Sequence, residues 1–207
     1  MHKVIEHLRK NEDNLPGFQS HLKLAPYRAT PPNFNKLIVN SREAAISILL
    51  YQKGNEIMFP LIKRPVYNGK HSGQISFPGG KRELTDSDLL HTALRETEEE
   101  IGIPSKQILP LHALSKIYIP PSQFIVNPYL MFSEDSLSFK ADEIEVEEIL
   151  EINIKDLLDD RNLKQTKLKH NDNLVINTPY FDLNDQVVWG ATAMILSEFK
   201  DLLKNES

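Results

Sequence analysis

Acidic side chains are concentrated in one short segment of the chain, Arg95-Glu96-Thr97-Glu98-Glu99-Glu100-Ile101-Gly102. A helical residue turns by about 100°, so Glu96, Glu99 and Glu100 fall within roughly one 100° sector of a helix. Hard divalent cations prefer several carboxylate and carbonyl oxygens that converge on one point. The spacing therefore indicates that these three glutamates could hold a divalent metal ion, with the Gly80 carbonyl as a weaker candidate ligand.

A solvated acidic surface is the alternative interpretation of any glutamate run. Like charges at this helical spacing cost only about 0.2–0.5 kcal/mol per pair on an exposed helix, so water would tolerate them. Two features favour a metal site here. The opposite face of the predicted helix is apolar, and the helix follows a Gly79–Gly80 turn that comes directly after a strand-like run. Glycine permits backbone conformations and close approaches that other residues prohibit.

The helix that must position these carboxylates has start and stop signals in the sequence. Its N-cap is predicted to be Asp86, Ser87 or Asp88, because short polar side chains accept bonds from the first free backbone N–H groups. Gly102 is predicted to end the helix, and Pro104 prevents its continuation. The apolar face is supplied by residues spaced at helical intervals, namely Leu89, Leu90, Ala93 and Leu94.

The rest of the chain alternates between strand-like and helix-like patterns. Strands are expected at Ala44–Tyr51, Ile57–Arg64, Gly73–Pro78, Ser115–Pro120, Phe124–Phe132 and Glu145–Ile152, with a final hairpin region at Leu174–Leu183. Helices are expected at Val4–Lys10, Ile154–Asp160 and Val188–Asn205. The first two strands flank a Gln-Lys-Gly-Asn turn and are expected to form a hairpin.

Length and composition limit the class of protein. The chain has 207 residues, 40% of them hydrophobic, which is enough for one domain with a core. We expect residues 1–40 to be an N-terminal arm and linker, and residues 41–205 to be the catalytic domain. The net charge of −5 gives no overall basic field, so no nucleic-acid partner is expected. No cysteine, signal-peptide pattern or membrane-length apolar run is present, so we predict a cytoplasmic protein without a membrane partner.

The segment from Pro78 to Ile103 resembles the Nudix box, whose second half reads R-E-U-x-E-E-x-G-U with U aliphatic. Every fixed position of that half matches except that Thr97 replaces the aliphatic residue. In the first half Asp86 stands where glutamate is usual, and eight residues rather than seven separate it from Arg95. The extra residue, with Phe77-Pro78-Gly79-Gly80 and Ala93-Leu94-Arg95-Glu96, resembles the coenzyme A pyrophosphatase branch of the family.

This resemblance implies a fold and a reaction. The fold is an α/β/α sandwich with a mixed β-sheet and a loop–helix–loop catalytic motif. The reaction is metal-dependent hydrolysis of a diphosphate bond in a nucleoside diphosphate derivative, with Mg²⁺ or Mn²⁺ as cofactor. For coenzyme A the products would be 3',5'-adenosine bisphosphate and 4'-phosphopantetheine. Family habit also suggests a homodimer.

The resemblance also suggests roles for individual residues. Glu96, Glu99 and Glu100 are the expected metal ligands, and Arg95 is expected to orient Glu99. Glu96 is the first choice for the general base that takes a proton from water. A reserve of acids further along the chain could serve instead, and the sequence does not rank its members: Glu143, Glu145, Glu147 and Glu148.

An upstream signature of the same branch suggests substrate-binding residues. Arg64, Lys70 and His71 are candidates for phosphate binding, because arginine and lysine offer charge and donors to phosphate oxygens. Gly69 stands where the branch usually has arginine. Either Lys70 takes over that contact or the preference for coenzyme A is weaker, and the same residues could also be ordinary surface residues of a loop.

Two other functions are compatible with the same residues. One keeps the chemistry and changes the substrate to ADP-ribose or a dinucleotide. The other is a Nudix module that senses a nucleotide without cleaving it, against which the presence of Arg95, Glu96, Glu99 and Glu100 argues.

Overall fold

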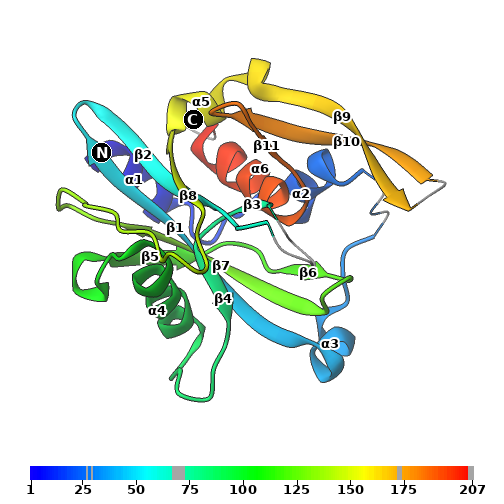
Figure 1. Cartoon of the computed structure of the whole chain (residues 1–207), viewed down its shortest axis with the longest axis horizontal. Coiled ribbons are helices and arrows are strands. Elements are labelled where there is room, and N and C mark those ends of the chain that lie inside the picture. Colours follow the sequence, from blue (N-terminus) through cyan, green and yellow to red (C-terminus); the bar gives the residue numbers. More distant parts are fainter. Residues whose placement is uncertain (27, 29, 67–72, 172–173, 205–207) are drawn as a thin grey trace.

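The structure is a computed structural model that describes residues 1–26, 28, 30–66, 73–171 and 174–204, without the side chains of residues 168–176. Within these ranges no helix has the length and the apolar character needed to cross a membrane. Figure 1 shows the whole chain, coloured along the sequence.

The described chain begins with helices and continues with runs of strands separated by single helices. The α-helices are α1 (His2–Lys10), α2 (Phe18–Leu24), α3 (Phe34–Leu37), α4 (Leu89–Ile101), α5 (Ile154–Leu158) and α6 (Gly190–Lys204). The strands are β1 (Arg42–Lys53), β2 (Glu56–Lys63), β3 (Ile75–Ser76), β4 (Gly79–Lys81), β5 (Leu109–Ala113), β6 (Ile117–Ile119), β7 (Phe124–Phe132), β8 (Glu148–Asn153), β9 (Leu163–Asn171), β10 (Leu174–Leu183) and β11 (Gln186–Val188). Short 3₁₀ turns lie at Ile38–Asn40, Ser105–Gln107 and Asp160–Asn162.

The main sheet has 8 strands and is mixed, as predicted. Its order is β3-β2-β1-β7-β5, with β4 paired to β1, β6 to β7 and β8 to β2. The central pair β1–β7 is parallel, with Ala45 opposite Asn127, while β1 pairs with β2 and β4 in antiparallel fashion. A second sheet of 3 strands, β11-β10-β9, lies beside α6 (Figure 1).

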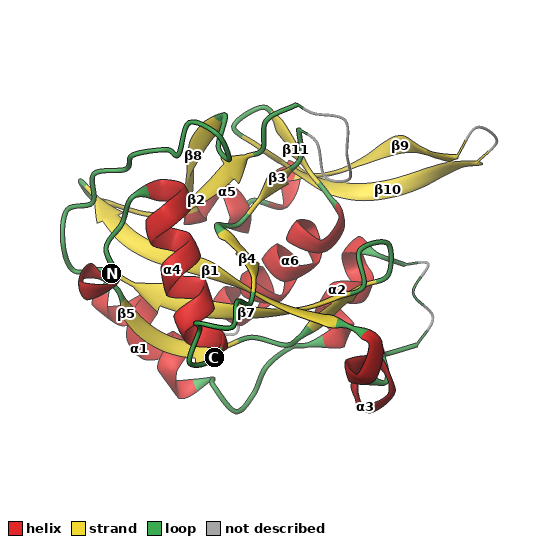
Figure 2. Ribbon diagram, turned by 60° about the horizontal axis from the view of Figure 1, so that its bottom comes forward, coloured by secondary structure: helices red, strands yellow, loops and turns green. Residues whose placement is uncertain are grey.

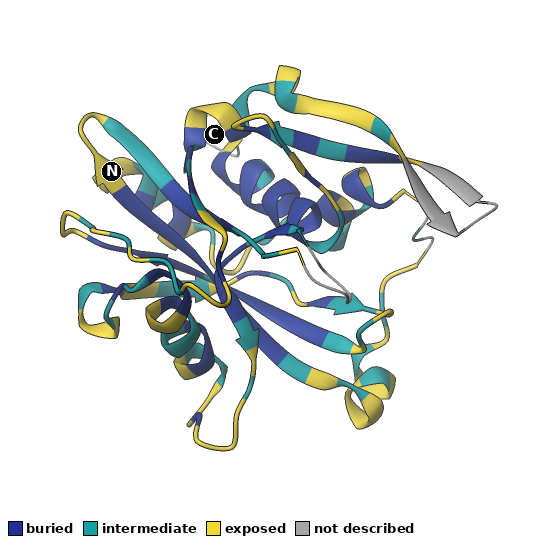
Figure 3. Ribbon diagram, viewed as in Figure 1, coloured by how far each residue is buried: buried dark blue, intermediate teal, exposed yellow. Residues whose placement is uncertain are grey.

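The two faces of the main sheet bury separate apolar clusters. Along β1, Ile48 and Leu50 join the cluster on the α6 side, whereas Ala45 and Leu49 join the cluster on the α4 side. This alternation follows from the period of two in a strand. Figure 2 shows α4 on one face and α6 on the other, and Figure 3 shows the inner faces of both as buried. The α/β/α sandwich is confirmed.

The two N-terminal helices contribute to the core. Ile5 and Leu8 of α1, with Leu24 and the adjoining Ala25, belong to the cluster under α6. A buried polar contact reinforces them, because His21 Nε2 lies 2.8 Å from the Glu198 carboxylate of α6. Burial alone raises the pKa of Glu198, but hydrogen bonds from His21 and Ser115 outweigh it and hold the pKa below its ordinary value. The division of the chain at residue 40 stays a prediction.

Most predicted elements are found, with local corrections. Within the expected strand Gly73–Pro78 only Ile75–Ser76 pairs, as β3 against β2. The chain then crosses to β1, where Gly79–Lys81 forms β4, so the predicted turn at Gly79 and Gly80 is the start of a strand. The strand expected from Glu145 begins at Glu148, and the final helix begins at Gly190 because Val188 still pairs in β11. The sequence pattern did not predict β5, β9, β11, α2 or α3 as separate elements.

Leu8→Ala tests whether the N-terminal segment is part of the core. The Leu8 side chain is wholly buried, so we expect the free energy of unfolding to fall by about 2–5 kcal/mol, the usual cost of a core cavity. Urea denaturation followed by circular dichroism measures this change. Val39→Ala is the matched control, since Val39 is 78% exposed and its truncation should cost less than about 0.5 kcal/mol. Equal effects of the two substitutions would contradict the assignment.

Candidate active site

Capping residues define both ends of helix α4. The carboxylate of Asp88 accepts a hydrogen bond from the backbone N–H of His91 at 2.8 Å, so Asp88 is the N-cap. Gly102 ends the helix in the left-handed conformation, with φ of 72°, and its N–H bonds to the Glu98 carbonyl. These two caps fix the length of the helix that carries the glutamates.

Asp86 anchors Arg95 and does not cap the helix. Its buried carboxylate accepts two bonds from the Arg95 guanidinium, from Nε at 3.0 Å and from Nη2 at 3.1 Å. Thr92 and His91 also contact it. The Arg95 contact is the main cause that holds the pKa of Asp86 well below its ordinary value, and it raises the pKa of Arg95. Asp86, although shorter than the glutamate expected at this position, therefore still reaches Arg95.

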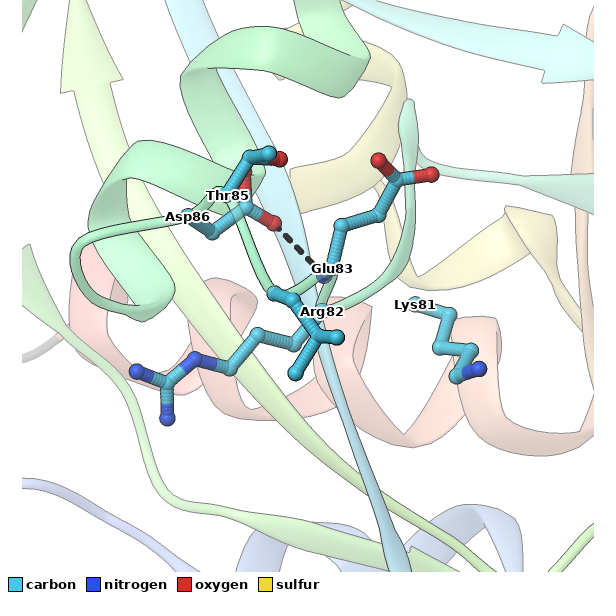
Figure 4. Close-up of a pocket in the computed structure, with 6 residues that line it drawn as sticks. Lys81, Arg82, Glu83, Thr85 and Asp86 are labelled. Carbon is cyan, nitrogen blue, oxygen red and sulfur yellow. Dashed lines mark hydrogen bonds between the residues drawn. The ribbon is translucent and has the colours of Figure 1, made fainter.

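The loop that carries Asp86 follows β4 and lines an open hollow. The hollow measures about 640 Å³ and is lined by residues 81–86. Figure 4 shows the bond that closes the loop, in which the Glu83 N–H donates to the Asp86 carboxylate at 2.9 Å. Arg95 also donates to the Lys81 carbonyl at 3.2 Å. The loop is thus tied to the same arginine that organises α4.

Glu96 lies directly against Gly80 of the glycine turn, by which we mean Gly79 and Gly80, the first two residues of β4. A Cβ atom built on Gly80 would be only 2.5 Å from Glu96 Oε1, so no larger residue fits at position 80 without displacing the carboxylate. Glu96 Oε1 also lies 2.9 Å from Arg95 Nη2, and the side chain is 12% exposed. Burial raises the pKa of Glu96, and Arg95 opposes this shift.

Glu100 is the most deeply buried of the α4 glutamates and contacts Gly79. Its carboxylate accepts the Gly79 N–H at 2.7 Å, while Arg64 Nη2 lies 3.5 Å from its other oxygen. The side chain is 1% exposed, and burial raises its pKa to about 8. A Cβ atom on Gly79 would lie 2.4 Å from the Ala45 carbonyl of β1, so the turn is held between α4 and the sheet.

Glu99 differs from the other two candidate ligands. Its side chain is 57% exposed and its carboxylate pairs with Arg95 Nη1 at 2.7 Å, as the sequence predicted. Across the described ranges, no three histidine, aspartate or glutamate side chains are grouped so that they could hold a metal ion. The convergence of all three glutamates on one ion therefore stays a prediction.

The residues at the turn nevertheless suit a hard divalent cation. Glu96 and Glu100 supply carboxylate oxygens, and the turn at Gly79–Gly80 supplies backbone next to them, which is the donor type that Mg²⁺ and Mn²⁺ prefer. A carboxylate as buried as Glu100 is costly to ionise unless a positive charge compensates it. The long contact with Arg64 compensates only in part.

Thr97, the departure from the aliphatic pattern, has a polar partner across the helix–sheet interface. Its hydroxyl lies 2.7 Å from the Ser47 hydroxyl of β1 and 2.6 Å from the Ala93 carbonyl. Both side chains are completely buried. Because a hydroxyl donates one hydrogen and accepts others, the two residues can satisfy each other. Ser47 is fifty positions away in the sequence, so no local pattern identifies it.

The structure gives the four reserve acids different surroundings. Glu147 pairs with Lys63 at 2.6 Å, and Glu148 stands opposite Lys63 in the β2–β8 register. Glu143 and Glu145 are exposed. Burial is the main cause of the raised pKa values of Glu96 and Glu100, and the charge of Glu145 adds to both shifts.

The loop before β8 is tied to α4 at one end and to β2 at the other. The Asp142 N–H donates to the Glu100 carbonyl at 3.1 Å, and the Glu147 N–H donates to the Lys63 carbonyl at 2.8 Å. Glu145 lies between these two ties in the sequence, on an exposed part of the loop.

Arg64 is the predicted substrate residue that the structure brings to the site. Its Nη2 donates to the Gly79 carbonyl at 3.3 Å as well as facing Glu100. Lys70 and His71 lie outside the described residues. The site therefore combines carboxylates from α4, backbone of Gly79 and Gly80 at the start of β4 and one cation from the end of β2.

Comparison with known proteins gives the same family as the resemblance found in the sequence. The NUDIX domain family matches residues 41–171. The mitochondrial coenzyme A diphosphatase NUDT8 of Mus musculus is 31% identical over 166 residues, covering 76% of this chain and 77% of that protein. The uncharacterized Nudix hydrolase NudL of Yersinia enterocolitica is 31% identical over 174 residues, covering 84% and 87%.

Solved structures share the fold. A Nudix hydrolase from M. smegmatis, RenU, superposes with a TM-score of 0.56 at 14% identity, covering 80% of this chain and 88% of that one. At this identity the likeness concerns the fold alone.

Thr97→Val tests the buried hydroxyl pair. Ser47 then loses the hydrogen bond that Thr97 supplies, so we expect the free energy of unfolding to fall by about 1–3 kcal/mol. Adding Ser47→Ala removes the stranded hydroxyl and should recover part of that loss. Thr85→Val, at an exposed loop position, is the control in the same urea denaturation series. A double variant no more stable than Thr97→Val alone would show that the two hydroxyls do not depend on each other.

The raised pKa of Glu100 predicts a pH dependence of stability in metal-free protein. The folded state keeps this proton up to about pH 8, whereas the unfolded chain releases it near the ordinary glutamate pKa of 4.5. The contribution of Glu100 to the free energy of unfolding therefore falls as pH rises through this window, by at most about 1.4 kcal/mol per pH unit.

Glu100→Gln removes that titration. In EDTA, the variant should gain stability relative to the natural chain between pH 5 and pH 8, measured by urea denaturation at both values. A constant difference between the two proteins across this range would contradict the burial of an ionisable Glu100.

Proposed function

The chain belongs to the Nudix hydrolase family, whose reaction is the hydrolysis of diphosphate bonds, and from this premise we propose that its substrate is coenzyme A. The products are 3',5'-adenosine bisphosphate and 4'-phosphopantetheine. The observation that carries the hydrolytic reaction is the pair of carboxylates, Glu96 and Glu100, held against the Gly79–Gly80 turn. The choice of coenzyme A is supported by the Phe77–Gly80 signature and by 31% identity to a coenzyme A diphosphatase.

We further propose that Mg²⁺ or Mn²⁺ is held by Glu96, Glu99 and Glu100, with the Gly80 carbonyl as a weaker ligand. When bound, such an ion neutralises diphosphate charge, polarises the phosphorus–oxygen bonds and lowers the pKa of water. Arg95 orients the carboxylates, since it contacts both Glu96 and Glu99. Asp86 in turn fixes the guanidinium, so it acts through Arg95 as a positioning residue.

Glu145 is our choice for the general base, ahead of Glu96. Glu96 is confined between Gly80 and the Arg95 guanidinium, which leaves it suited to holding a cation rather than to exchanging protons with water. Glu145 is exposed, its charge acts on both Glu96 and Glu100, and its loop is tied to the end of α4. A carboxylate in such a position can accept a proton from a nucleophilic water molecule.

Arg64 is proposed to bind a phosphate oxygen of the substrate. It already faces Glu100 and the Gly79 carbonyl, so its positive charge lies where the diphosphate would meet the glycine turn. Lys70 and His71 are proposed as further phosphate donors on the grounds of the sequence signature alone. A homodimer likewise stays a prediction from the family resemblance.

A second substrate class, ADP-ribose or a dinucleotide, is compatible with the same carboxylates. Gly69, which replaces the usual arginine of the coenzyme A signature, is the observation that favours it.

A substrate panel with product identification tests the proposal. With Mg²⁺ or Mn²⁺ we expect coenzyme A to yield 3',5'-adenosine bisphosphate, at a higher kcat/KM than ADP-ribose or dinucleotides yield their products. EDTA should abolish the reaction, and Glu100→Gln serves as the inactive control. Cleavage of ADP-ribose with no adenosine bisphosphate released from coenzyme A would overturn the substrate assignment and keep the hydrolase.

Glu145→Gln tests the general base. Loss of a positioned base typically lowers kcat by about 10²–10⁴-fold, and we expect a fall in this range with little change in KM. Glu147→Gln is the matched control, because that neighbouring acid pairs with Lys63. If Glu145→Gln and Glu147→Gln have similar kcat values, the assignment returns to Glu96.

A further inference from the structure

A second hollow lies on the α6 side of the main sheet, away from the glutamates. Its volume is about 310 Å³, and its walls come from α2, the segment that leads into α3, β6 and α6. Figure 2 shows α2 and α6 on the side of the main sheet opposite to α4, and β6 belongs to the sheet itself. We call this hollow the α2–β6 cavity.

The α2–β6 cavity is separate from the candidate active site. Two of its lining residues, Ile117 and Met194, belong to the apolar cluster under α6. The residues of α4 that face the sheet, such as Ala93 and Ile101, belong to the other cluster. The main sheet therefore lies between this cavity and the helix that carries Glu96 and Glu100.

The walls of the cavity are mostly apolar. They include aromatic rings from three different segments, Phe18, Phe34 and Tyr118, together with Pro32 and Met194. Ligand sites typically combine such walls with a few polar groups in a volume of about 300–1,000 Å³. Rings and proline faces offer stacking surfaces for a planar, apolar body.

The charged residues of the cavity lining are basic, and His21 and Ser115 are its other polar members. Arg28 and Lys116 are both among its lining residues, which include no aspartate or glutamate within the described chain. This local excess is unusual in a protein with a net charge of −5. Arg28 is held in place by the bond from its Nη1 to the Tyr118 carbonyl at 2.9 Å.

Glu198, which contacts the lining residues His21 and Ser115, is paired with its own partners. It meets His21 at 2.8 Å and accepts the N–H groups of Gly17 and Ser115, both at 3.2 Å. Its side chain is wholly buried. Within the described residues neither Arg28 nor Lys116 forms an ion pair with Glu198, so both charges stay available to an occupant of the cavity.

We propose that the α2–β6 cavity is a second ligand site, which binds a small planar aromatic anion of the kind represented by a purine nucleoside monophosphate. The aromatic and proline walls receive the planar body, and Arg28 and Lys116 bind the anionic group. This site is independent of the reaction at α4. Because α2 and α6 both line it, an occupant would also stabilise the N-terminal segment against the rest of the fold.

Titration calorimetry with adenosine monophosphate in EDTA tests the proposal on the full chain. We expect adenosine monophosphate to bind, and adenosine or inorganic phosphate alone to bind at least about tenfold more weakly, because each lacks half of the recognition. Arg28→Gln/Lys116→Gln should lower the affinity at least about tenfold. The matched control is Lys3→Gln/Lys106→Gln, which changes the net charge equally at exposed positions and should have no effect.

Two further variants locate the binding and guard against unfolding. Glu100→Gln should leave the affinity for adenosine monophosphate unchanged if the ligand occupies the α2–β6 cavity. Lys116→Glu, at an exposed position, should weaken binding in a protein whose urea denaturation curve is unaltered. Absence of binding by the natural chain, or binding that responds to Glu100→Gln and not to the variants at Arg28 and Lys116, would overturn the proposal.

Discussion

The close approach between a glycine turn and a helix is the constraint on which the active site depends. Gly79 donates its N–H to Glu100 at 2.7 Å, and a side chain on either glycine would collide with β1 or with Glu96. The turn can lie there only because it lacks Cβ atoms. This contact places two carboxylates in a buried position, where burial raises their pKa values and makes a divalent cation the natural compensation.

The surrounding contacts keep α4 in register with that turn. Asp86 holds the Arg95 guanidinium of α4, and the hydrogen bond between Thr97 and Ser47 ties the helix to β1. The loop before β8 is bonded to the end of the helix through Asp142. These contacts come from segments far apart in the sequence. The tertiary fold therefore builds the site, although its three candidate metal ligands lie within five consecutive residues of α4.

The sequence predicted what local chemistry determines. The mixed sheet, the β1–β2 hairpin, the end of α4 at Gly102 and the pairing of Arg95 with Glu99 all follow from short-range patterns or from the family resemblance. It did not predict the burial of Leu8, because helical periodicity shows an apolar face without showing what covers it. The sequence showed Thr97 only as a departure from the aliphatic pattern of the motif. Its hydrogen-bond partner could not be identified because Ser47 lies on a strand far away in the sequence.

Mn²⁺ binding, measured by electron paramagnetic resonance titration, tests the central claim most directly. The account predicts that the natural chain binds Mn²⁺ and that Glu96→Gln and Glu100→Gln each weaken binding by at least about tenfold. Glu98→Gln, on the same helix but exposed, should bind as the natural chain does. Unchanged Mn²⁺ affinity in both Glu96→Gln and Glu100→Gln would contradict the claim that the carboxylates at the glycine turn hold the metal.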